Sequence, residues 1–313
     1  MATAFLFPGQ GSQFVGMGAD LAQRFPAARA HFEAADDLLG YPLTDLMFGR
    51  HTDDEAAAEE ALKQTEVTQP ALYVHSLAAM AVLRAAGQTP DMVAGHSLGE
   101  YSALAAAGAL SFEDGLRVVR RRGELMAEAG DRRPGAMAAV LGADDDAIEA
   151  VCRDVSSGSV GVVQPANFNA PGQIVISGDV DAVEQAMDEM PGRTIRLPVS
   201  GAFHSPLMEY AEEGLAEALS AVDIQPPPCP VYLNVTGRPT TDPDEIRKRL
   251  LEQLRAPVRW AQTLRRMQDN GAERFVEVGA GKVLRGLVRR TLGRDIATQG
   301  AGTADALEAL AEA

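Results

Sequence analysis

The hydrophobic and polar positions of this chain switch between short apolar runs and longer helical periods. Apolar runs at Thr3–Phe7 and Met92–Gly95 are each followed by a turn that contains glycine, and the second turn leads into an alanine-rich helix that ends near Gly108. A helical period also covers 70–86 and ends at Gly87, where a helix C-cap is expected. Strand, turn and helix in this order are typical of α/β folds with a parallel sheet.

The pattern changes from about Gly135. Short strands and helices follow in the order β-α-β-β-α-β, which is the ferredoxin-like order. The expected strands are 136–141, 161–167, 173–177 and 193–198, and the expected helices are 145–155 and 180–190. Because α/β patterning resumes afterwards, this unit is predicted to be an insertion. The predicted division is a hydrolase-like parallel-sheet α/β domain made of residues 1–132 and 199–313, with a ferredoxin-like subdomain at 133–198.

The remaining pattern completes the larger domain. Helices are expected near 18–39 and 55–63 and at 205–221, 243–253 and 260–270, with strands at 231–235 and 275–278. The end from about Ala301 is weakly patterned, and we expect it to fray.

Composition narrows the range of partners and of locations in the cell. The 313 residues carry a formal net charge of −16, which disfavours binding to nucleic acid or to an anionic membrane. No apolar stretch reaches the roughly 20 residues of a membrane span. Cys152 and Cys229 form no metal-binding or disulfide pattern, so the chain is predicted to be a cytoplasmic protein without a metal site. We also expect a monomer.

Residues 95–99, Gly-His-Ser-Leu-Gly, match the G-x-S-x-G nucleophile elbow between a predicted strand and a predicted helix. Small residues on both sides of the turn let the serine project at the edge of the sheet. The positive end of the following helix dipole would face a developing oxyanion. Ser97 is therefore the predicted nucleophile; the alternative is a tight turn with an incidental serine.

A serine nucleophile needs a base, and His204 is the best-placed of the five histidines because it lies in a loop between a strand and a helix. His96 is better placed to line the pocket, and His31 and His75 lie in helical patterns that indicate surface or packing positions. An acid that orients the base would lie between serine and histidine in chain order. The candidates are Asp144–Asp146 and Asp179, and a dyad oriented by a backbone carbonyl is an equal alternative.

The first glycine-rich loop is not a phosphate loop, because Phe14 occupies the third glycine position of G-x-G-x-x-G. It is better suited to bring Gln10 to the nucleophile as an oxyanion donor, together with the N–H of Leu98. Four arginines crowd one helical stretch, namely Arg117, Arg120, Arg121 and Arg122. Three are predicted to be solvated and one to point inward, where it would clamp a carboxylate.

Six blocks carry a resemblance that covers nearly the whole chain. They lie at 7–13, 95–104, 122–126, 167–178, 203–208 and 253–260. In this order they resemble the freestanding bacterial malonyl-CoA:acyl carrier protein transacylases. That family combines a hydrolase-like α/β domain with a ferredoxin-like insertion, in agreement with the pattern above.

The resemblance implies a ping-pong transfer of malonyl from malonyl-CoA to the phosphopantetheine thiol of acyl carrier protein in fatty-acid synthesis. It implies that Ser97 carries the acyl group, His204 is the base, Gln10 and Leu98 form the oxyanion hole, Arg122 binds the malonyl carboxylate and Gln253 supports His204 through its main chain. Malonyl-CoA is then a substrate, and no bound cofactor is expected.

Two finer expectations concern selectivity and docking. Residues 201–204, Gly-Ala-Phe-His, are similar to the motif that related polyketide acyltransferases use for malonyl, so Phe203 is expected to exclude a methyl branch at the α-carbon. A basic patch must receive the acidic carrier. Its candidates are Lys282, Arg285, Arg289 and Arg290, with Arg193 and Arg196 possible from the small subdomain.

Four alternatives stay open at this point. A trans-acting acyltransferase of a polyketide synthase would share the fold and the chemistry, and a malonate-transfer subunit of a decarboxylase complex is a further relative. A serine esterase or thioesterase would use water, but it needs neither Arg122 nor the insertion. A non-catalytic docking module would not need Ser97, His204 and Gln10 together.

Overall fold

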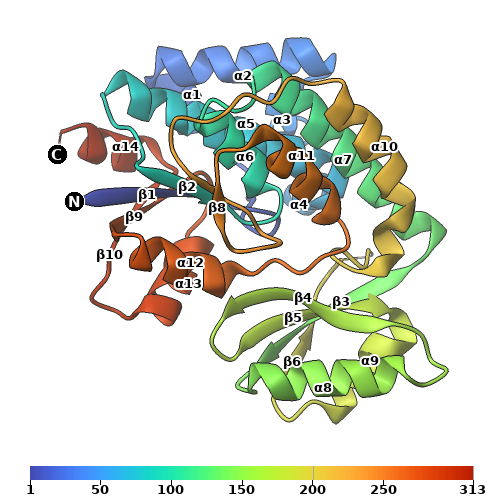
Figure 1. Ribbon diagram of the computed structural model, residues 1–313. Helices are drawn as coiled ribbons and strands as arrows, with labels where there is room; N and C mark the ends of the chain where they lie inside the picture. The colour runs from blue at the N-terminus through green and yellow to red at the C-terminus, as the bar shows by residue number, and fades with distance from the viewer. Residues whose placement is uncertain (200, 313) are drawn as a thin grey trace.

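The computed structural model describes residues 1–199 and 201–312, which form two β-sheets surrounded by helices (Figure 1). The strands of the larger sheet are β1 (Ala2–Phe7), β2 (Met92–Gly95), β7 (Val231–Tyr232), β8 (Pro239–Thr240), β9 (Ala272–Val278) and β10 (Ala297–Ala301). Their order is β10-β9-β1-β2-β7-β8, and every pair is parallel except β7 with β8. The predicted parallel-sheet α/β fold is confirmed. Ser200 and Ala313, which fall in the predicted larger domain, lie outside the described residues.

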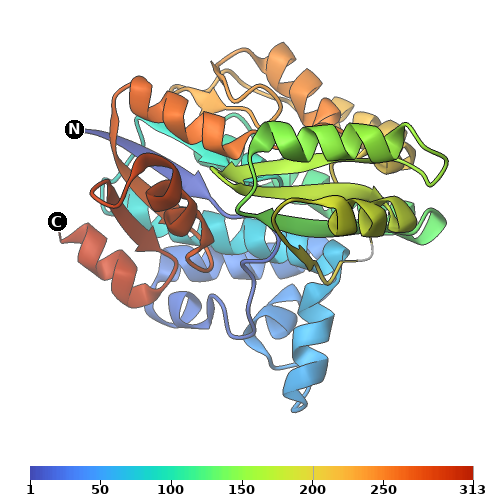
Figure 2. The same ribbon diagram turned by 90° about the horizontal axis from the view of Figure 1, so that it is seen from below.

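The smaller sheet is antiparallel and lies at one end of the molecule, where Figure 2 shows it from below with its two helices. Its elements are β3 (Gly135–Leu141), α8 (Asp145–Ser156), β4 (Val163–Ala170), β5 (Gln173–Asp179), α9 (Val180–Glu189) and β6 (Arg193–Arg196). The strand order is β4-β5-β3-β6, and the two helices pack on the sheet through a core of their own. The predicted β-α-β-β-α-β order is therefore present, while the domain boundaries stay a prediction.

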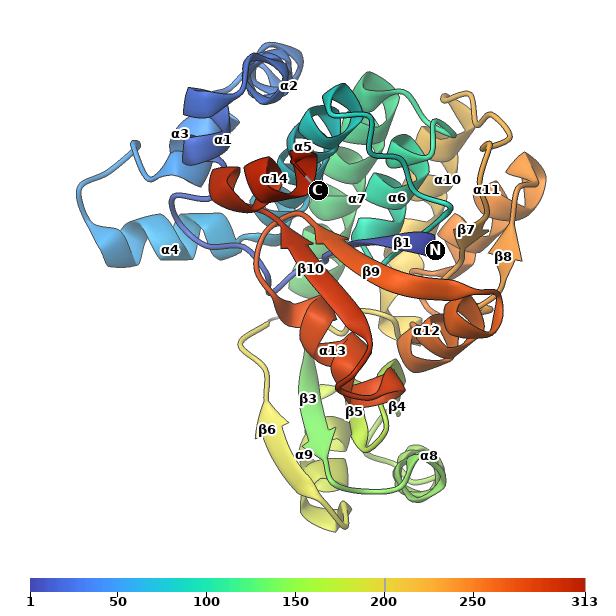
Figure 3. The ribbon, with the colours of Figure 1, turned by 90° about the vertical axis from the view of Figure 1, so that its left-hand side faces the viewer.

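Helices cover both faces of the larger sheet (Figure 3), and strand β1 is therefore buried on both sides. Successive side chains of a strand point to opposite faces. Phe5 and Phe7 accordingly enter the core on one face of the sheet, whereas Ala4 and Leu6 enter the core on the other face. This double burial explains the continuous apolar run of the strand.

The helices outside the smaller sheet are α1 (Ala19–Arg24), α2 (Pro26–Leu39), α3 (Leu43–Phe48), α4 (Glu55–Lys63), α5 (Thr65–Ala85), α6 (Gly99–Ala106), α7 (Phe112–Arg132), the 3₁₀ helix η1 (Pro206–Glu209), α10 (Tyr210–Ser220), α11 (Pro243–Glu252), α12 (Trp260–Asp269), α13 (Val283–Leu292) and α14 (Ala304–Ala311). Two predicted helices have different bounds in the structure, and a proline is the reason in both cases. The expected helix 18–39 is divided before Pro26, and the expected helix 205–221 starts as η1 at Pro206, since proline favours the first position of a new helix.

Helix α5 begins at Thr65, earlier than the predicted start at Pro70. Proline inside a helix removes the backbone hydrogen bond to the residue four positions before it, here Glu66. Almost every side chain from Thr68 to Leu83 is nevertheless buried, and this tertiary packing outweighs the local preference.

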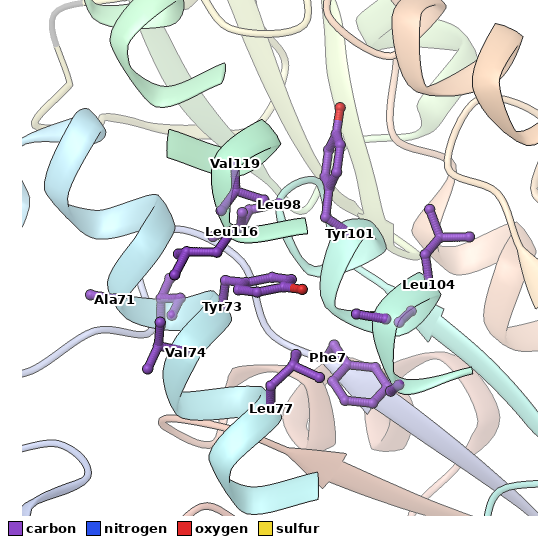
Figure 4. Close-up of a cluster of buried hydrophobic side chains, with 14 of the residues drawn as sticks. Phe7, Ala71, Tyr73, Val74, Leu77, Leu98, Tyr101, Leu104, Leu116 and Val119 are labelled. Carbon is purple, nitrogen blue, oxygen red and sulfur yellow. The ribbon is translucent and has the colours of Figure 1, made fainter. Parts of the chain in front are cut away.

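The core beneath the nucleophile turn joins α5, α6 and α7 to β1 (Figure 4). The labelled side chains come from Phe7, Ala71, Tyr73, Val74, Leu77, Leu98, Tyr101, Leu104, Leu116 and Val119. Helices α5 and α7 meet at Gly115, where a Cβ atom would lie 2.1 Å from the hydroxyl oxygen of Tyr73. Glycine at this position lets the Tyr73 hydroxyl donate to the carbonyl oxygen of Phe112 at 3.1 Å.

Residues 297–311 contain an edge strand and a helix, so the expectation of fraying from about Ala301 is wrong for this segment. Strand β10 pairs with β9, and Leu307 and Leu310 of α14 are buried. Arg24 of α1 forms salt bridges with Asp305 and Glu308 of α14. The pattern missed β10 because an edge strand reading Ala-Thr-Gln-Gly-Ala lacks bulky apolar residues. In the described part of the chain, no helix is both long and apolar enough to cross a membrane.

His75 supplies a test of this fold. The side chain lies in α5 with 0% exposure, and neither ring nitrogen makes a hydrogen bond with a described residue. Burial lowers the pKa of His75 from 6.5 to about 4. Between these values the unfolded chain binds more protons, so the free energy of unfolding must fall as the pH falls.

We expect His75→Gln to remove about 1.5 kcal/mol of the stability loss between pH 6.5 and pH 5, since one pKa unit corresponds to about 1.4 kcal/mol and the unfolded histidine is already half protonated at pH 6.5. Urea unfolding at both pH values, for the wild type and the variant, measures this difference. Equal pH dependence of the two proteins would show that His75 is not protonated on unfolding.

Candidate functional site

The predicted nucleophile elbow is present between β2 and α6. Ser97 adopts φ 51°, which is the left-handed region that side chains other than glycine rarely enter. A Cβ on Gly95 would lie 1.8 Å from the carbonyl oxygen of Gly99, and a Cβ on Gly99 would lie 2.0 Å from the carbonyl oxygen of Phe7. Both glycines of the motif are therefore required by backbone contacts, and the turn projects Ser97 above the sheet.

Ser97, His204 and the main chain of Gln253 form a hydrogen-bonded row. Ser97 Oγ lies 2.8 Å from His204 Nε2, and His204 Nδ1 lies 2.8 Å from the carbonyl oxygen of Gln253. Because that carbonyl can only accept, Nδ1 carries the proton and Nε2 is free to accept one from the serine. His204 also has a left-handed backbone, with φ 58°.

The environment keeps His204 neutral. Burial, followed by the positive charge of Arg122, lowers the pKa of His204 to about 3, against the opposing effect of the Gln253 carbonyl. A neutral imidazole at pH 7 can act as a general base.

The carboxylates considered as orienting acids lie elsewhere. Asp144 precedes α8, which begins with Asp145 and Asp146, and Asp179 pairs with Arg133 at 2.9 Å. The geometry therefore matches the dyad oriented by a backbone carbonyl, which was one of the two predicted alternatives.

Only one of the four crowded arginines in α7 points inward. The other three form exposed ion pairs, Arg117 with Asp114, Arg120 with Glu124 and Arg121 with Glu124 and Glu128. Arg122 is 1% exposed, and its Nη2 donates to Ser97 Oγ at 3.2 Å. This is the residue that the resemblance had indicated.

The guanidinium of Arg122 is held by amide oxygens. Nη1 donates to Gln69 Oε1 at 2.6 Å and Nη2 to Gln253 Oε1 at 2.9 Å. It makes no salt bridge with a carboxylate among residues 1–199 and 201–312, so its charge is not neutralised by direct pairing.

The predicted oxyanion donors lie beside the elbow. The loop before Gln10 touches the turn directly, since a Cβ on Gly9 would lie 2.3 Å from the carbonyl oxygen of His96. Gln10 Nε2 donates to Thr65 Oγ1 at 3.2 Å, and the residue lines a cavity of about 540 Å³ between α4, α5 and the segment after β6. The N–H of Leu98 makes no hydrogen bond within the described chain and is available to an oxyanion.

His96 is predicted from its position to line the pocket, and Phe203 is expected from the motif resemblance to limit the space at the α-carbon; both roles stay predictions. His96 Nε2 lies 2.8 Å from Asn169 Oδ1 and its ring packs against Trp260, so it is turned away from the serine proton. Burial lowers the pKa of His96. The Phe203 ring covers Gly201, where a Cβ would lie 2.5 Å from the ring. Glycine at the first position of this motif therefore determines where the ring lies.

Sequence reasoning missed several residues that hold the site together. Asn234 accepts a hydrogen bond from the Ser97 N–H at 2.7 Å and donates to the carbonyl oxygen of Gly95 at 2.7 Å. It had been assigned to a strand 231–235, but β7 ends at Tyr232. Glu100, Gln69 and Asn169 were also missed. The one available signal was Glu100, a lone acid in an alanine-rich helix.

Some of the predicted docking residues already have a side-chain partner, and others do not have one among the described residues. Arg285 pairs with the buried Glu277 at 3.2 Å, and Arg290 donates to Gln173 at 3.1 Å. Lys282 and Arg289 are exposed and make no side-chain hydrogen bond or salt bridge within the described chain. Of the two further candidates, Arg196 pairs with Glu184, and Arg193 is exposed. No group of three or more His, Cys, Asp or Glu residues is arranged for a metal in the described part, and the absence of a cofactor stays a prediction.

A family model described as "Acyl transferase domain" matches residues 4–305. The chain belongs to the acyl transferase domain family. This membership confirms the enzyme class that the sequence blocks indicated. It also agrees with the elbow serine and its histidine.

Individual members of the family are similar over almost the full length. The malonyl CoA-acyl carrier protein transacylase of Bacillus subtilis strain 168 is 47% identical over 291 residues, which cover 92% of this chain and 89% of that protein. The solved malonyl CoA-acyl carrier protein transacylase of Coxiella burnetii has a TM-score of 0.93 at 36% identity, covering 100% of this chain and 97% of the other. A malonyl-transacylase solved in complex with a type II PKS acyl-carrier protein has a TM-score of 0.92 at 38% identity, with coverage of 100% and 99%.

The elbow contacts give a paired test in this acyltransferase. Gly99→Ala forces a Cβ against the backbone of β1 and should lower the free energy of unfolding by about 1–3 kcal/mol or more. Gly286→Ala is the matched control, because that helical glycine has open space around it and alanine should add about 0.5–1 kcal/mol. Urea midpoints of both variants measure the effect, and a Gly99→Ala protein as stable as the wild type would contradict the contact argument.

Proposed function

We propose that this protein transfers a malonyl group from malonyl-CoA to the phosphopantetheine thiol of an acyl carrier protein, through a malonyl ester on Ser97. The observation that carries the proposal is the buried guanidinium beside the nucleophile. Arg122 is 1% exposed, lies 3.2 Å from Ser97 Oγ and is held by neutral amides. A second carboxylate on the acyl group would pair directly with this charge, whereas an acetyl group would leave it without a direct partner.

In the first half-reaction, His204 Nε2 takes the proton of Ser97 as Oγ attacks the thioester carbonyl. The N–H of Leu98 and the side chain of Gln10 would stabilise the oxyanion. Coenzyme A then leaves as its thiol, with the proton that His204 returns. The carbonyl of Gln253 keeps the imidazole in the required tautomer throughout.

In the second half-reaction, the carrier thiol attacks the malonyl ester and the same groups work in reverse. His204 takes the thiol proton and gives it back to Ser97 Oγ. We propose that Phe203, which lies over Gly201, limits the space at the α-carbon and so favours malonyl over methylmalonyl.

A polyketide carrier is the second candidate partner. It is favoured by one observation, the similar malonyl-transacylase solved with a type II PKS acyl-carrier protein. The chemistry at Ser97 would be unchanged, and only the docking surface would differ. A monomeric state, a cytoplasmic location and the absence of nucleic-acid and membrane partners stay predictions.

Intact-protein mass spectrometry after brief incubation with malonyl-CoA tests the acyl intermediate. We expect a malonyl-sized mass increase on the wild type but not on Ser97→Ala, because the ester needs the hydroxyl. Holo-acyl carrier protein should discharge the adduct. Free malonate accumulating without an adduct would indicate a hydrolase instead, and an adduct that only a polyketide carrier discharges would identify the second candidate.

The predicted docking surface for the carrier can be tested at Lys282 and Arg289, its two exposed residues without a side-chain partner in the described chain. Lys282→Glu combined with Arg289→Glu should raise KM for the carrier on the order of tenfold and leave malonyl-CoA loading unchanged, because exposed charges act mainly on encounter. Arg238→Glu is the matched control, since this exposed arginine lies beside β8 at the opposite edge of the sheet. Steady-state transfer at low salt measures the effect, and equal KM values for both variants would exclude this surface.

A further inference from the structure

Glu100 is a buried acid that the proposed mechanism does not use. It lies in the first turn of α6, three residues after Ser97, and is 0% exposed. Its Oε2 accepts hydrogen bonds from the Asn234 N–H at 3.1 Å and from Gln253 Nε2 at 2.7 Å. Its Oε1 makes no hydrogen bond with any described residue. A carboxylate in such a place needs either a compensating charge or a proton.

Both partners of Glu100 hold the reacting groups. Asn234 Oδ1 receives the Ser97 N–H, and Gln253 Nε2 also donates to the Ser97 carbonyl at 3.1 Å. The same Gln253 side chain accepts from Arg122 through Oε1, while its main-chain carbonyl accepts from His204. Glu100 therefore lies one hydrogen bond from each residue that orients the nucleophile, the base and the inward arginine.

The side-chain amide of Gln253 lies between Glu100 and Arg122 and makes a hydrogen bond with each of them. Arg122 is held by neutral oxygens, and Glu100 is a carboxylate whose negative charge acts on it across that amide. Binding of a free acyl carboxylate to Arg122 would place two negative charges beside one positive charge in a buried network. Burial penalises that excess charge strongly, and protonation of one acid relieves it.

We propose that Glu100 is a positioning residue whose carboxyl takes up one proton from solvent when the free carboxylate of a dicarboxylic acyl group binds Arg122. This inference rests on the proposed function. The proton would enter at Oε1, because Oε2 already accepts two N–H groups. Acyl transfer itself exchanges a thioester for an ester and a thiol, so loading consumes no proton at neutral pH, and any uptake reports on the site.

The pKa of Glu100 in the free site agrees with this proposed proton uptake. Burial raises the pKa of Glu100 to about 7, although the hydrogen bonds from Gln253 and Asn234 and the charge of Arg122 act in the opposite direction. Neutralising Arg122 with a substrate carboxylate removes the last of these effects and raises the pKa of Glu100 further. The other titratable groups around it are Tyr101 on its own helix and His204 beyond Gln253.

The test is proton uptake during a single turnover of loading, followed with an indicator dye in weak buffer near pH 7.5. Wild type loaded with malonyl-CoA should take up a substantial fraction of one proton per acyl group, whereas acetyl-CoA, which has no second carboxylate, should cause little uptake. Glu100→Gln should load malonyl without uptake. Glu277→Gln, which changes another buried acid in β9, should keep the wild-type uptake.

Complete loading of wild type without uptake, or equal uptake by wild type and Glu100→Gln, would overturn the proposal. Malonyl loading of wild type without proton uptake overturns the proposal even where Glu100→Gln fails to fold. Absence of any malonyl adduct by mass spectrometry would instead refute the proposed function, so the two failures are distinguishable.

The positioning role has its own readout. Glu100→Gln keeps an oxygen for both N–H donors, and its loading kcat should stay within about tenfold of wild type. Glu100→Ala leaves these donors unpaired and should lower kcat by about 10- to 100-fold. Loss of the pH dependence of KM for malonyl-CoA in Glu100→Gln, with its fold intact by circular dichroism, would separate this role from a merely structural one.

Discussion

The contact between the backbones of Gly95 and Gly99 is the constraint on which the active site depends. A Cβ on Gly95 would come within 1.8 Å of the Gly99 carbonyl oxygen, so strand β2 and helix α6 meet with no side chain between them. At this turn Ser97 takes a left-handed conformation, and the N–H of Leu98 makes no hydrogen bond with any described residue. This one contact thus helps to set the direction of the proposed nucleophile and the position of the proposed oxyanion donor.

The base is held from two sides of the molecule. The carbonyl of Gln253, at the end of α11, fixes the His204 ring, whereas Gln164 of β4 donates to the His204 carbonyl at 2.8 Å and to that of Arg255 at 3.0 Å. A left-handed histidine persists only where its surroundings hold it. Strand β4 is in turn joined to the larger part through the bridge between Asn167 and Val258. The smaller sheet therefore stabilises the loop that carries His204, the proposed base.

The sequence predicted the elements whose signal is local. Apolar runs identified β1 and β2, glycines identified the turn at Ser97, and the ferredoxin-like order was evident from the spacing of short elements. It did not reveal β10, because an edge strand needs little apolar surface, and it did not reveal the short helix α14. Asn234, Gln69 and Asn169 also escaped notice, since they act only through partners distant in sequence. Which arginine turns inward depends on the rotation of α7 against α5, and this was indicated by resemblance rather than by the helical period.

The partners of Arg122 are amides and not carboxylates, and this leaves its positive charge able to bind an acid. A permanent carboxylate partner would compete with the carboxylate of an acyl group, whereas Gln69 and Gln253 satisfy the N–H donors and leave the charge in place. Keeping an unneutralised guanidinium buried is costly, and Glu100, behind Gln253, reduces that cost without occupying the acyl pocket. The same arrangement would disfavour an acyl group without a second carboxylate, which would bring no charge to pair with Arg122. Selectivity for a dicarboxylic acyl group would then depend on the charge balance of the empty site as much as on the contacts of the bound acyl group.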